Sequence, residues 1–299
     1  MDSRLYTFLM VDKTKNYTRA AENLNLTQPA VYKQIKYLEN YYGVNLFIKD
    51  GRRLKLTDEG EILRNYAHQI INIHEELKEK LQEKDLSREK YRIGATMTIG
   101  AYILPRIIYK YMDLNNNIDI SLTVNNTNMI LQKLLDREIS MAVIEGPFDK
   151  IKFKYKKFKD DELVLIGPTN GRLAEINKIS IDELLKENFI LREKFSGTRE
   201  IIESLLISKG YSHDVLNNHM EINSINGIKT LVEEGVGLSI LSKESVKREI
   251  DLKTLKIISI KDITIVRELN FVYIYDKDMD FIEKFINFSL RKEVAEDDN

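Results

Sequence analysis

The segment that most constrains this chain is residues 18–60, TRAAENLNLTQPAVYKQIKYLENYYGVNLFIKDGRRLKLTDEG. It predicts two short helices joined by a tight turn. Thr18 is expected to cap the first helix, and residues 25–27 are expected to form the turn. Thr27 then caps the second helix, and Pro29 lies in its first turn, where a missing N–H costs little. This layout is a helix-turn-helix.

The second helix has an inward and an outward face. Val31, Ile35 and Leu38 recur at helical spacing, so they are expected to pack inward. The residues left on the outer face are Gln28, Pro29, Tyr32, Lys33 and Lys36. A helix fits the major groove of DNA, its N-terminus favours phosphate, and these side chains can donate to base edges or backbone oxygens. We therefore predict that this helix reads duplex DNA.

A basic hairpin follows the second helix. Residues 49–56 read KDGRRLKL and predict two strands around an Asp-Gly turn, with basic residues along their sides. Such a hairpin would lie across the sugar-phosphate backbone as a wing. The predicted DNA-binding residues outside the helix face are Thr18, Thr27, Lys49, Arg52 and Arg53. The alternative, a small helical domain with a solvated charge run, explains the helices but not the wing.

Charge is distributed unevenly along the chain. All 299 residues together carry a formal net charge of -1, yet Met1 to Leu56 contain ten basic and five acidic residues. This positive amino-terminal module predicts DNA binding that weakens by orders of magnitude as salt rises from low to moderate concentration.

A long helix is predicted next. Residues 61–83, EILRNYAHQIINIHEELKEKLQE, contain neither Gly nor Pro. The apolar residues at alternating spacings of three and four are Leu63, Tyr66, Ile70, Ile73 and Leu77. This spacing is typical of a coiled-coil seam, although a helix packed on its own domain would give a similar pattern. His68 and His74 have no second metal-type ligand at a suitable spacing and are expected to be solvated.

The rest of the chain predicts an α/β domain. Apolar runs or alternations typical of strands occur at residues 91–95, 118–124, 141–144 and 163–166. Helical stretches such as residues 129–138 and 181–186 lie between them, which predicts a parallel sheet. Ligands of open α/β sheets bind beyond the carboxyl ends of strands, beside helix N-termini.

Three polar loops occupy that position. Their candidate effector-binding residues are Thr96, Met97 and Thr98, then Asn126 and Thr127, and finally Ser196, Gly197, Thr198 and Arg199. Hydroxyls, amides and a guanidinium together predict a receptor for a carboxylate, sulfate or phosphate. An ordinary capped helix start explains the Ser-Gly-Thr-Arg sequence equally well.

Several protein classes are disfavoured by what the sequence lacks. The chain has no cysteine, which excludes disulfides, thiolate metal sites and a cysteine nucleophile. It shows no nucleophile elbow, phosphate loop, dinucleotide glycine fingerprint or metal cluster, so we expect no catalytic residue, metal or cofactor. The amino terminus has no export signal, and no apolar run reaches the roughly 18 residues of a membrane span. We therefore expect a cytoplasmic protein without membrane contact.

The stretch from Thr18 to Gly60 resembles the amino-terminal domain of the LysR-type transcriptional regulators. The matching positions are Ala20, Ala21, Leu24, Thr27, Gln28, Pro29, Ala30, Ile35, Leu38, Glu39, Gly43, Leu46, Phe47, Arg52, Leu56, Thr57 and Gly60. Three positions depart from the family pattern, since Tyr32 replaces the usual serine, Lys49 an arginine and Glu59 an alanine. Tyr32 keeps a hydroxyl donor but moves it outward, so the base or phosphate that it reaches can differ. Lys49 keeps the charge but loses the bidentate fork.

The resemblance implies a chain of three parts. These are a winged helix-turn-helix DNA-binding domain at residues 1–60, a linker helix at residues 61–88 and an effector-binding domain at residues 89–299. In the family, the linker helix pairs two chains. The last part is expected to have the two-lobed, periplasmic-binding-protein-like α/β fold, with two crossover strands and a small effector held between the lobes.

The same resemblance sets the expected lobe limits. Lobe I would comprise residues 89–161 and 265–299, and lobe II residues 162–264. Ser224, Val236 and Gly237 of lobe II join the candidate effector-binding residues because they resemble segments that complete this lobe in the family.

The function implied is sequence-specific regulation of transcription in response to a small, anionic metabolite. The implied partners are operator DNA, the effector, RNA polymerase and further copies of the chain in a homodimer or homotetramer. The Ser-Gly-Thr-Arg sequence is similar to regulators of sulfur assimilation and carbon fixation. The alternatives are an architectural DNA-binding protein without a ligand and an α/β enzyme. Activation and repression are both left open.

Overall fold

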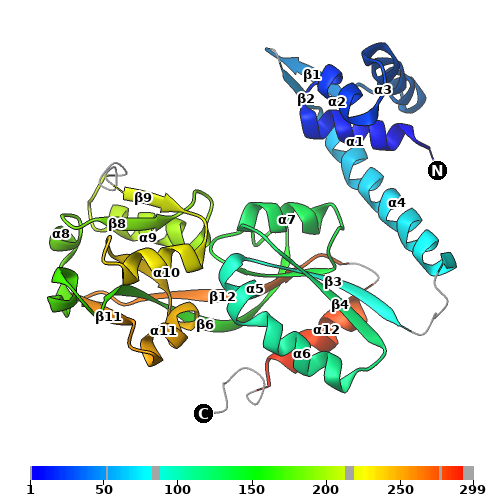
Figure 1. Ribbon diagram of the computed structural model, residues 1–299. Helices are drawn as coiled ribbons and strands as arrows, with labels where there is room; N and C mark the ends of the chain where they lie inside the picture. The colour runs from blue at the N-terminus through cyan, green and yellow to red at the C-terminus, as the bar shows by residue number, and fades with distance from the viewer. Residues whose placement is uncertain (1, 52, 83–87, 213–218, 276–277, 292–299) are drawn as a thin grey trace. The chain divides into compact units, whose positions relative to one another are not determined.

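The computed structural model describes residues 2–51, 53–82, 88–212, 219–275 and 278–291. The chain forms two compact units, one of Met1–Arg88 with Leu135–Glu138 and the other of Glu89–Leu134 with Ile139–Asn299. Figure 1 shows helices and a small hairpin in the first unit and an α/β domain in the second. Among the helices that the structure describes, none combines the length and apolar character needed to cross a lipid bilayer.

The first unit contains the predicted helix-turn-helix and wing. Its described elements are α1 Arg4–Thr14, α2 Tyr17–Leu24, α3 Gln28–Tyr42, β1 Phe47–Asp50, β2 Arg53–Leu56 and α4 Asp58–Gln82. The helix-turn-helix of α2 and α3 and the β1–β2 hairpin are confirmed, whereas α1 lies outside the predicted elements. Helix α4 begins ahead of the predicted linker, and residues 83–87 lie outside the described residues.

The N-cap of α2 is Asn16, so the capping role predicted for Thr18 is wrong. The Asn16 side chain accepts hydrogen bonds from the backbone N–H of Thr18 at 2.8 Å and of Arg19 at 3.1 Å. Asn and Thr are both good N-cap residues. Packing decides between them, because the Tyr17 ring lies against Phe47, with centroids 6.4 Å apart, and this contact keeps Tyr17 inside the first turn.

Helix α3 has the predicted cap and inward face. Thr27 accepts a hydrogen bond from the backbone N–H of Ala30 at 3.3 Å, and Pro29 lies in the first turn. Val31 and Ile35 are fully buried, and Leu38 is almost so. These residues join Phe8 of α1 and Phe47 of the hairpin in one core, which holds the outer face of α3 toward solvent.

The second unit is built on a sheet that runs through both lobes. Among the described residues its strands are β3 Glu89–Ala95, β4 Ile118–Val124, β5 Met141–Glu145, β6 Lys154–Pro168, β7 Lys178–Ile179, β10 Ser239–Ser242, β11 Leu255–Ile260 and β12 Ile265–Tyr273. Their order is β4-β3-β5-β12-β6-β11-β7, with β10 paired to β6. Strands β3, β4 and β5 are parallel, as predicted, whereas β6 and β12 form a long antiparallel pair that crosses between the lobes.

Helices cover both faces of the lobe I sheet (Figure 1). They are α5 Met97–Tyr102, α6 Leu104–Leu114, α7 Thr127–Leu135 and α12 Met279–Ser289. Ile107 of α6 and Phe281 and Phe285 of α12 are buried in one core with the strands. On the other face, Ile130 of α7 packs directly over Gly94 of β3.

Lobe II repeats this layering around β10, β11 and the second half of β6. Its other described elements are η1 Arg172–Glu175, α8 Ile181–Leu184, β8 Phe189–Arg192, α9 Gly197–Ser208, β9 His219–Ile222, α10 Ile225–Glu233 and α11 Lys243–Asp251. Ile202 and Leu206 of α9 lie in one apolar cluster, and Ile228 and Val232 of α10 lie in another. The α/β fold with two lobes and crossover strands is therefore confirmed, and the lobe limits remain a prediction.

Candidate functional site

The outer face of α3 presents most of its predicted residues to solvent. Gln28, Pro29, Tyr32 and Lys33 are exposed, and Lys36 is partly exposed. The Tyr17 ring packs edge-on against the Tyr32 ring at 5.6 Å between centroids, which orients the residue that replaces the usual serine. Amide, hydroxyl and ammonium donors therefore share one solvent-facing helix surface, as a major-groove contact requires.

Lys36 of this outer face already has a charged partner within the helix. Its Nζ lies 2.6 Å from Oε2 of Glu39, and this hydrogen bond raises the pKa of Lys36. The other Glu39 oxygen, Oε1, accepts from the backbone N–H of Leu46 at 2.9 Å. The buried Glu39 carboxylate thus ties α3 to the segment that enters the wing, and it partly neutralises Lys36.

The wing is described in part. Strands β1 and β2 pair from Phe47 with Leu56 to Asp50 with Arg53, and Lys49 is exposed. Arg52 and the side chain of Arg53 lie outside what the structure describes. The DNA-binding roles of all these residues remain predictions.

An apolar stripe runs along α4. Tyr66, Ile70, Ile73 and Leu77 are exposed, as the predicted seam requires. Leu63 instead packs, partly buried, against the core of the first unit, and its place in the seam stays a prediction. The exposed residues Ile62 and Leu81 extend the stripe at both ends. We call Ile62, Tyr66, Ile70, Ile73, Leu77 and Leu81 the α4 stripe.

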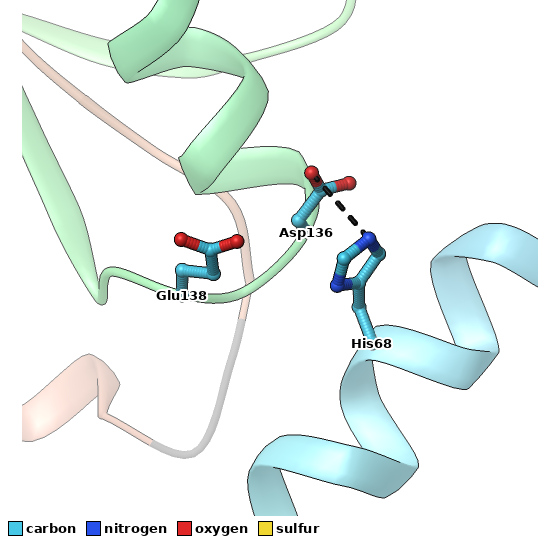
Figure 2. A group of neighbouring side chains, drawn as sticks. All are labelled: His68, Asp136 and Glu138. Atoms are coloured by element: carbon cyan, nitrogen blue, oxygen red, sulfur yellow. Dashed lines mark ion pairs between the residues drawn. The ribbon is translucent and has the colours of Figure 1, made fainter. Parts of the chain in front are cut away.

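His68 is not the solvated residue that the sequence predicts. Its Nε2 lies 3.6 Å from Oδ2 of Asp136, and the imidazole is largely covered. Figure 2 shows His68, Asp136 and Glu138 as neighbours in the first unit, and their ligand atoms all lie within 4.8 Å of one another. The imidazole and the Asp136 carboxylate pair with each other, and we assign this group no metal.

The predicted effector loops meet at Glu145, the last residue of the fully buried strand β5. The Thr96 hydroxyl donates a hydrogen bond to the Glu145 carboxylate, and the Thr127 hydroxyl donates to the Glu145 carbonyl oxygen at 3.4 Å. A Cβ placed on Gly197 would lie 2.6 Å from the same carbonyl oxygen. The start of α9 in lobe II therefore lies directly on lobe I, and a larger residue at 197 would push them apart.

Arg267 of β12 links these loops. Its Nε donates to Oδ2 of Asp161 at 2.8 Å, and its Nη1 donates to the Thr198 hydroxyl at 2.9 Å. Nη1 also lies 3.8 Å from Oε1 of Glu145, and Ser242 donates to the second Asp161 oxygen at 2.7 Å. All five side chains are buried. Nη2 of Arg267 is buried without a hydrogen-bond partner among the described residues. We call Thr96, Glu145, Asp161, Thr198, Ser242 and Arg267 the interlobe cluster.

The sequence analysis missed four members of the interlobe cluster. Arg267 and Asp161 are opposite each other in the β12–β6 register, but they are 106 positions apart in the chain. Glu145 and Ser242 each end a strand whose residues are all buried. A polar residue at the carboxyl end of a buried strand was therefore the signal available for these two.

Arg199 already has partners within lobe II. Its Nε donates to Glu203 at 2.7 Å, and its Nη1 donates to Glu221 at 2.6 Å and to the Arg192 carbonyl oxygen at 3.1 Å. The guanidinium thus joins the start of α9 to β8 and β9. This geometry favours a positioning role for Arg199 over the direct anion contact that the sequence suggests.

The remaining residues that were predicted to bind the effector lie in several different places. Thr98 is buried in α5 and Met97 is partly buried beside the lobe II core, whereas Asn126 and Ser224 cap α7 and α10 by accepting from backbone N–H groups. Val236 and Gly237 lie beside Asn188, which precedes the amino-terminal end of β8. Ser196 follows the carboxyl-terminal end of the same strand. The structure therefore does not bring Val236 and Gly237 to the interlobe cluster.

Known proteins share both parts of this chain. Residues 3–61 match the family described as bacterial regulatory helix-turn-helix protein, lysR family, and residues 84–292 match the LysR substrate binding domain. The Probable RuBisCO transcriptional regulator of Thalassiosira pseudonana is 34% identical over 275 residues, which cover 90% of each chain. The HTH-type transcriptional regulator CysL of Bacillus subtilis is 29% identical over 270 residues, covering 90% of this chain and 89% of CysL. The solved regulatory domain of Synechocystis PCC6803 CcmR in complex with 2-PG is 25% identical with a TM-score of 0.59, covering 67% of this chain and 95% of that one.

The fold and these matches define a DNA-binding regulator with an effector-binding domain. The chain belongs to the LysR family of transcriptional regulators. Its family and its named relatives are transcriptional regulators, so the chain is a regulator and not an enzyme. The RuBisCO regulator among its relatives agrees with the predicted likeness to carbon-fixation regulators.

Proposed function

We propose that a small metabolite with an anionic group binds at the interlobe cluster and thereby controls how the chain holds its operator. The observation that carries this proposal is Nη2 of Arg267, a buried guanidinium donor without a partner among the described residues. A buried donor that is left unsatisfied costs about 1 to 3 kcal/mol, which an accepting oxyanion would recover. The ligand would therefore stabilise the arrangement in which Arg267 joins both lobes.

Two further features favour an oxyanion. Helix α9 begins at Gly197 beside the cluster, and the Ser196 side chain is buried without capping the helix. Helix N-termini favour negative charge. Nη1 of Arg192, at the end of β8, is also buried without a partner in the described part of the chain. The start of α9 and the crossover strand β12 thus both offer donors at the interlobe cluster.

The carboxylates of the cluster limit what the ligand can be. Glu145 and Asp161 flank the single guanidinium of Arg267, so a bare polyanion would meet two like charges. A ligand with one anionic group and neighbouring hydroxyls fits better, because its hydroxyls can donate to Glu145. We therefore propose hydroxylated organic acids as the effector class. The 2-PG complex of the Synechocystis relative supports a small ligand in this kind of domain.

The proposal is tested by calorimetric titration of the full chain with a panel of hydroxylated carboxylic acids and phosphorylated acids. We expect Arg267→Lys to weaken binding of any ligand found by about 10- to 150-fold, a loss of about 1.5 to 3 kcal/mol. Lysine keeps the charge but lacks the planar guanidinium whose two Nη groups donate side by side. Lys186→Arg, an exposed substitution in lobe II, is the control. Unchanged affinity in Arg267→Lys would remove Arg267 from the site, and a panel without any hit would contradict the proposed ligand class.

We propose that Gln28 reads a base edge. Its side chain is exposed at the start of α3, where recognition helices contact DNA bases. Gln28→Ala should weaken binding to the cognate operator by about 1 to 3 kcal/mol while barely changing affinity for random DNA. Fluorescence anisotropy with both duplexes measures the difference. Equal losses on the two duplexes would show that Gln28 contacts the backbone alone.

The regulator acts, in our proposal, as a homodimer or homotetramer on chromosomal operators in the cytoplasm, where it contacts RNA polymerase. The α4 stripe supports pairing of two chains. The effector can shift regulation only by the difference between its affinities for two arrangements of the protein, one in which the lobes are joined through Arg267 and one in which they are not. A tenfold change in output therefore needs about 1.4 kcal/mol of differential binding.

A further inference from the structure

A lysine-rich surface lies at the start of β6, ahead of Asp161 of the interlobe cluster on the same strand. Residues 149–160 contain six lysines and two aspartates, in a chain whose net charge is -1. We call the exposed residues Lys150, Lys152, Lys154, Lys156 and Lys157 the lysine strip. The strip covers the turn before β6 and the first residues of the strand.

Among the residues that the structure describes, acids pair with only one lysine of the strip. Lys157 pairs with Asp160 at 2.7 Å and with Glu268 at 3.4 Å. Lys156 donates to the Asn287 side chain at 3.3 Å, an uncharged partner. Within the described part of the chain, no carboxylate pairs with Lys150, Lys152, Lys154 or Lys156. Their ammonium groups are therefore available to an external anion.

Aromatic rings lie among these lysines. The Nζ of Lys150 lies 5.0 Å from the Tyr155 ring centroid, and the Nζ of Lys154 lies 5.5 Å from that of Tyr275. Both rings are themselves exposed. Such cation–π contacts restrain the lysine side chains at the surface, so less conformational freedom is lost when they bind.

The strip also has an open strand edge. Strand β12 pairs with β6 along Lys154 to Leu163, whereas β10 and β11 join β6 only from Leu163 and Leu165 onward. Lysines on an edge strand oppose the addition of a further strand. The same lysines give a surface complementary to a polyanion.

We propose that the lysine strip binds the sugar-phosphate backbone of duplex DNA outside the segment held by the amino-terminal unit. DNA is the polyanion that this family binds, and lysine side chains serve as phosphate contacts without reading sequence. The effector domain then contributes to DNA binding. The length of duplex that the protein contacts depends on whether the lysine strip reaches the DNA.

The test is a salt titration of DNA binding by the full chain. Labelled mixed-sequence duplexes of about 20 and about 60 base pairs are compared by anisotropy between roughly 50 and 300 mM KCl. The strip variant replaces Lys150, Lys152, Lys154 and Lys156 with Gln. The matched control replaces the exposed residues Lys178, Lys186, Lys209 and Lys247 with Gln, and so removes the same charge elsewhere on the domain.

We expect the strip variant to reduce the slope of log K against log salt by about two to four per chain on the longer duplex, with a smaller change on the shorter one. The control variant should leave both slopes near those of the unmodified protein. Lys150→Gln with Lys152→Gln alters only the turn before β6 and should give about half of the effect even if the strand substitutions disturb folding.

Three outcomes would overturn the proposal. Unchanged slopes on both duplexes would show that the strip does not touch DNA. Equal losses in the strip and control variants would show a general effect of net charge. A change in sedimentation behaviour without a change in slope would assign the strip to contacts between copies of the chain.

Discussion

Replacing Arg267 with Met should lower the free energy of unfolding of the effector domain by about 3 to 5 kcal/mol. The guanidinium is buried between Asp161 and Glu145, whose carboxylates are also buried. Removing one partner of a buried ion pair leaves an uncompensated charge, and this cost exceeds the value of the pair itself. Urea unfolding gives the loss, and hydrogen exchange of peptides from β6 and β12 locates it.

A triple variant separates charge from shape at this position. Arg267→Met combined with Asp161→Asn and Glu145→Gln removes the ionic groups together, so most of the lost stability should return. The chain has two compact units, so the transition of the effector domain must be followed on its own peptides. A loss below about 1 kcal/mol in the single variant would show that Arg267 is solvated and does not join the lobes.

The double substitution Ile70→Asp and Ile73→Asp should convert the protein to monomers at micromolar concentration. Both side chains are exposed on the α4 stripe, and burying an isoleucine contributes about 1.5 to 3 kcal/mol. Four such side chains are lost per dimer, so the dissociation constant should rise about a thousandfold or more. Analytical ultracentrifugation measures the association state directly.

The same variant should bind operator DNA at least a hundredfold more weakly, because two linked reading units gain affinity from their connection. Ile207→Asp is the matched control, since Ile207 is an isoleucine with similar exposure on helix α9. If the double variant and the control both remain dimeric, the α4 stripe is not the pairing surface. If both become monomeric, charge on the chain rather than the stripe is responsible.

The amino-terminal unit was predictable because its signals are local. Thr27, Pro29 and the inward residues of α3 lie within one short segment, and each obeys a rule of helix capping or periodicity. Helix α1 could have been found in the same way, because Leu5, Phe8 and Val11 recur at helical spacing and are buried. Asn16 was missed as a cap because packing of Tyr17 on Phe47 decides where α2 begins.

The interlobe cluster was predictable only as a set of loops. The strand ends and the following helix starts locate Thr96, Thr127 and Thr198, and the structure brings all three to the interlobe cluster. The charged residues that join them depend on strand register over long sequence separations, as for Arg267 and Asp161. Register is set by the packing of both lobes, so no local pattern reveals it.

Arg199 is the reverse case, in which a residue predicted from the sequence already has charged partners in the fold. A guanidinium beside a helix start suggests an anion receptor, but its charge is taken by Glu203 four residues later and by Glu221 on the neighbouring strand. The first partner was visible at helical spacing, whereas the second needed the parallel pairing of β8 with β9. Candidate anion receptors in a sequence therefore need a search for acids at helical spacing before a role is assigned.

The most direct test of DNA reading by α3 is capture of genomic fragments by the purified full chain, with elution at rising salt. The unmodified protein is compared with a variant that carries Gln28→Ala and Lys33→Ala on the exposed face of α3. We predict a small set of fragments that outlasts random DNA as salt rises, and we predict loss of this set, but not of low-salt binding, in the variant. A protein that holds no fragment more tightly than random DNA, or a variant that keeps the same set, would contradict this mode of recognition.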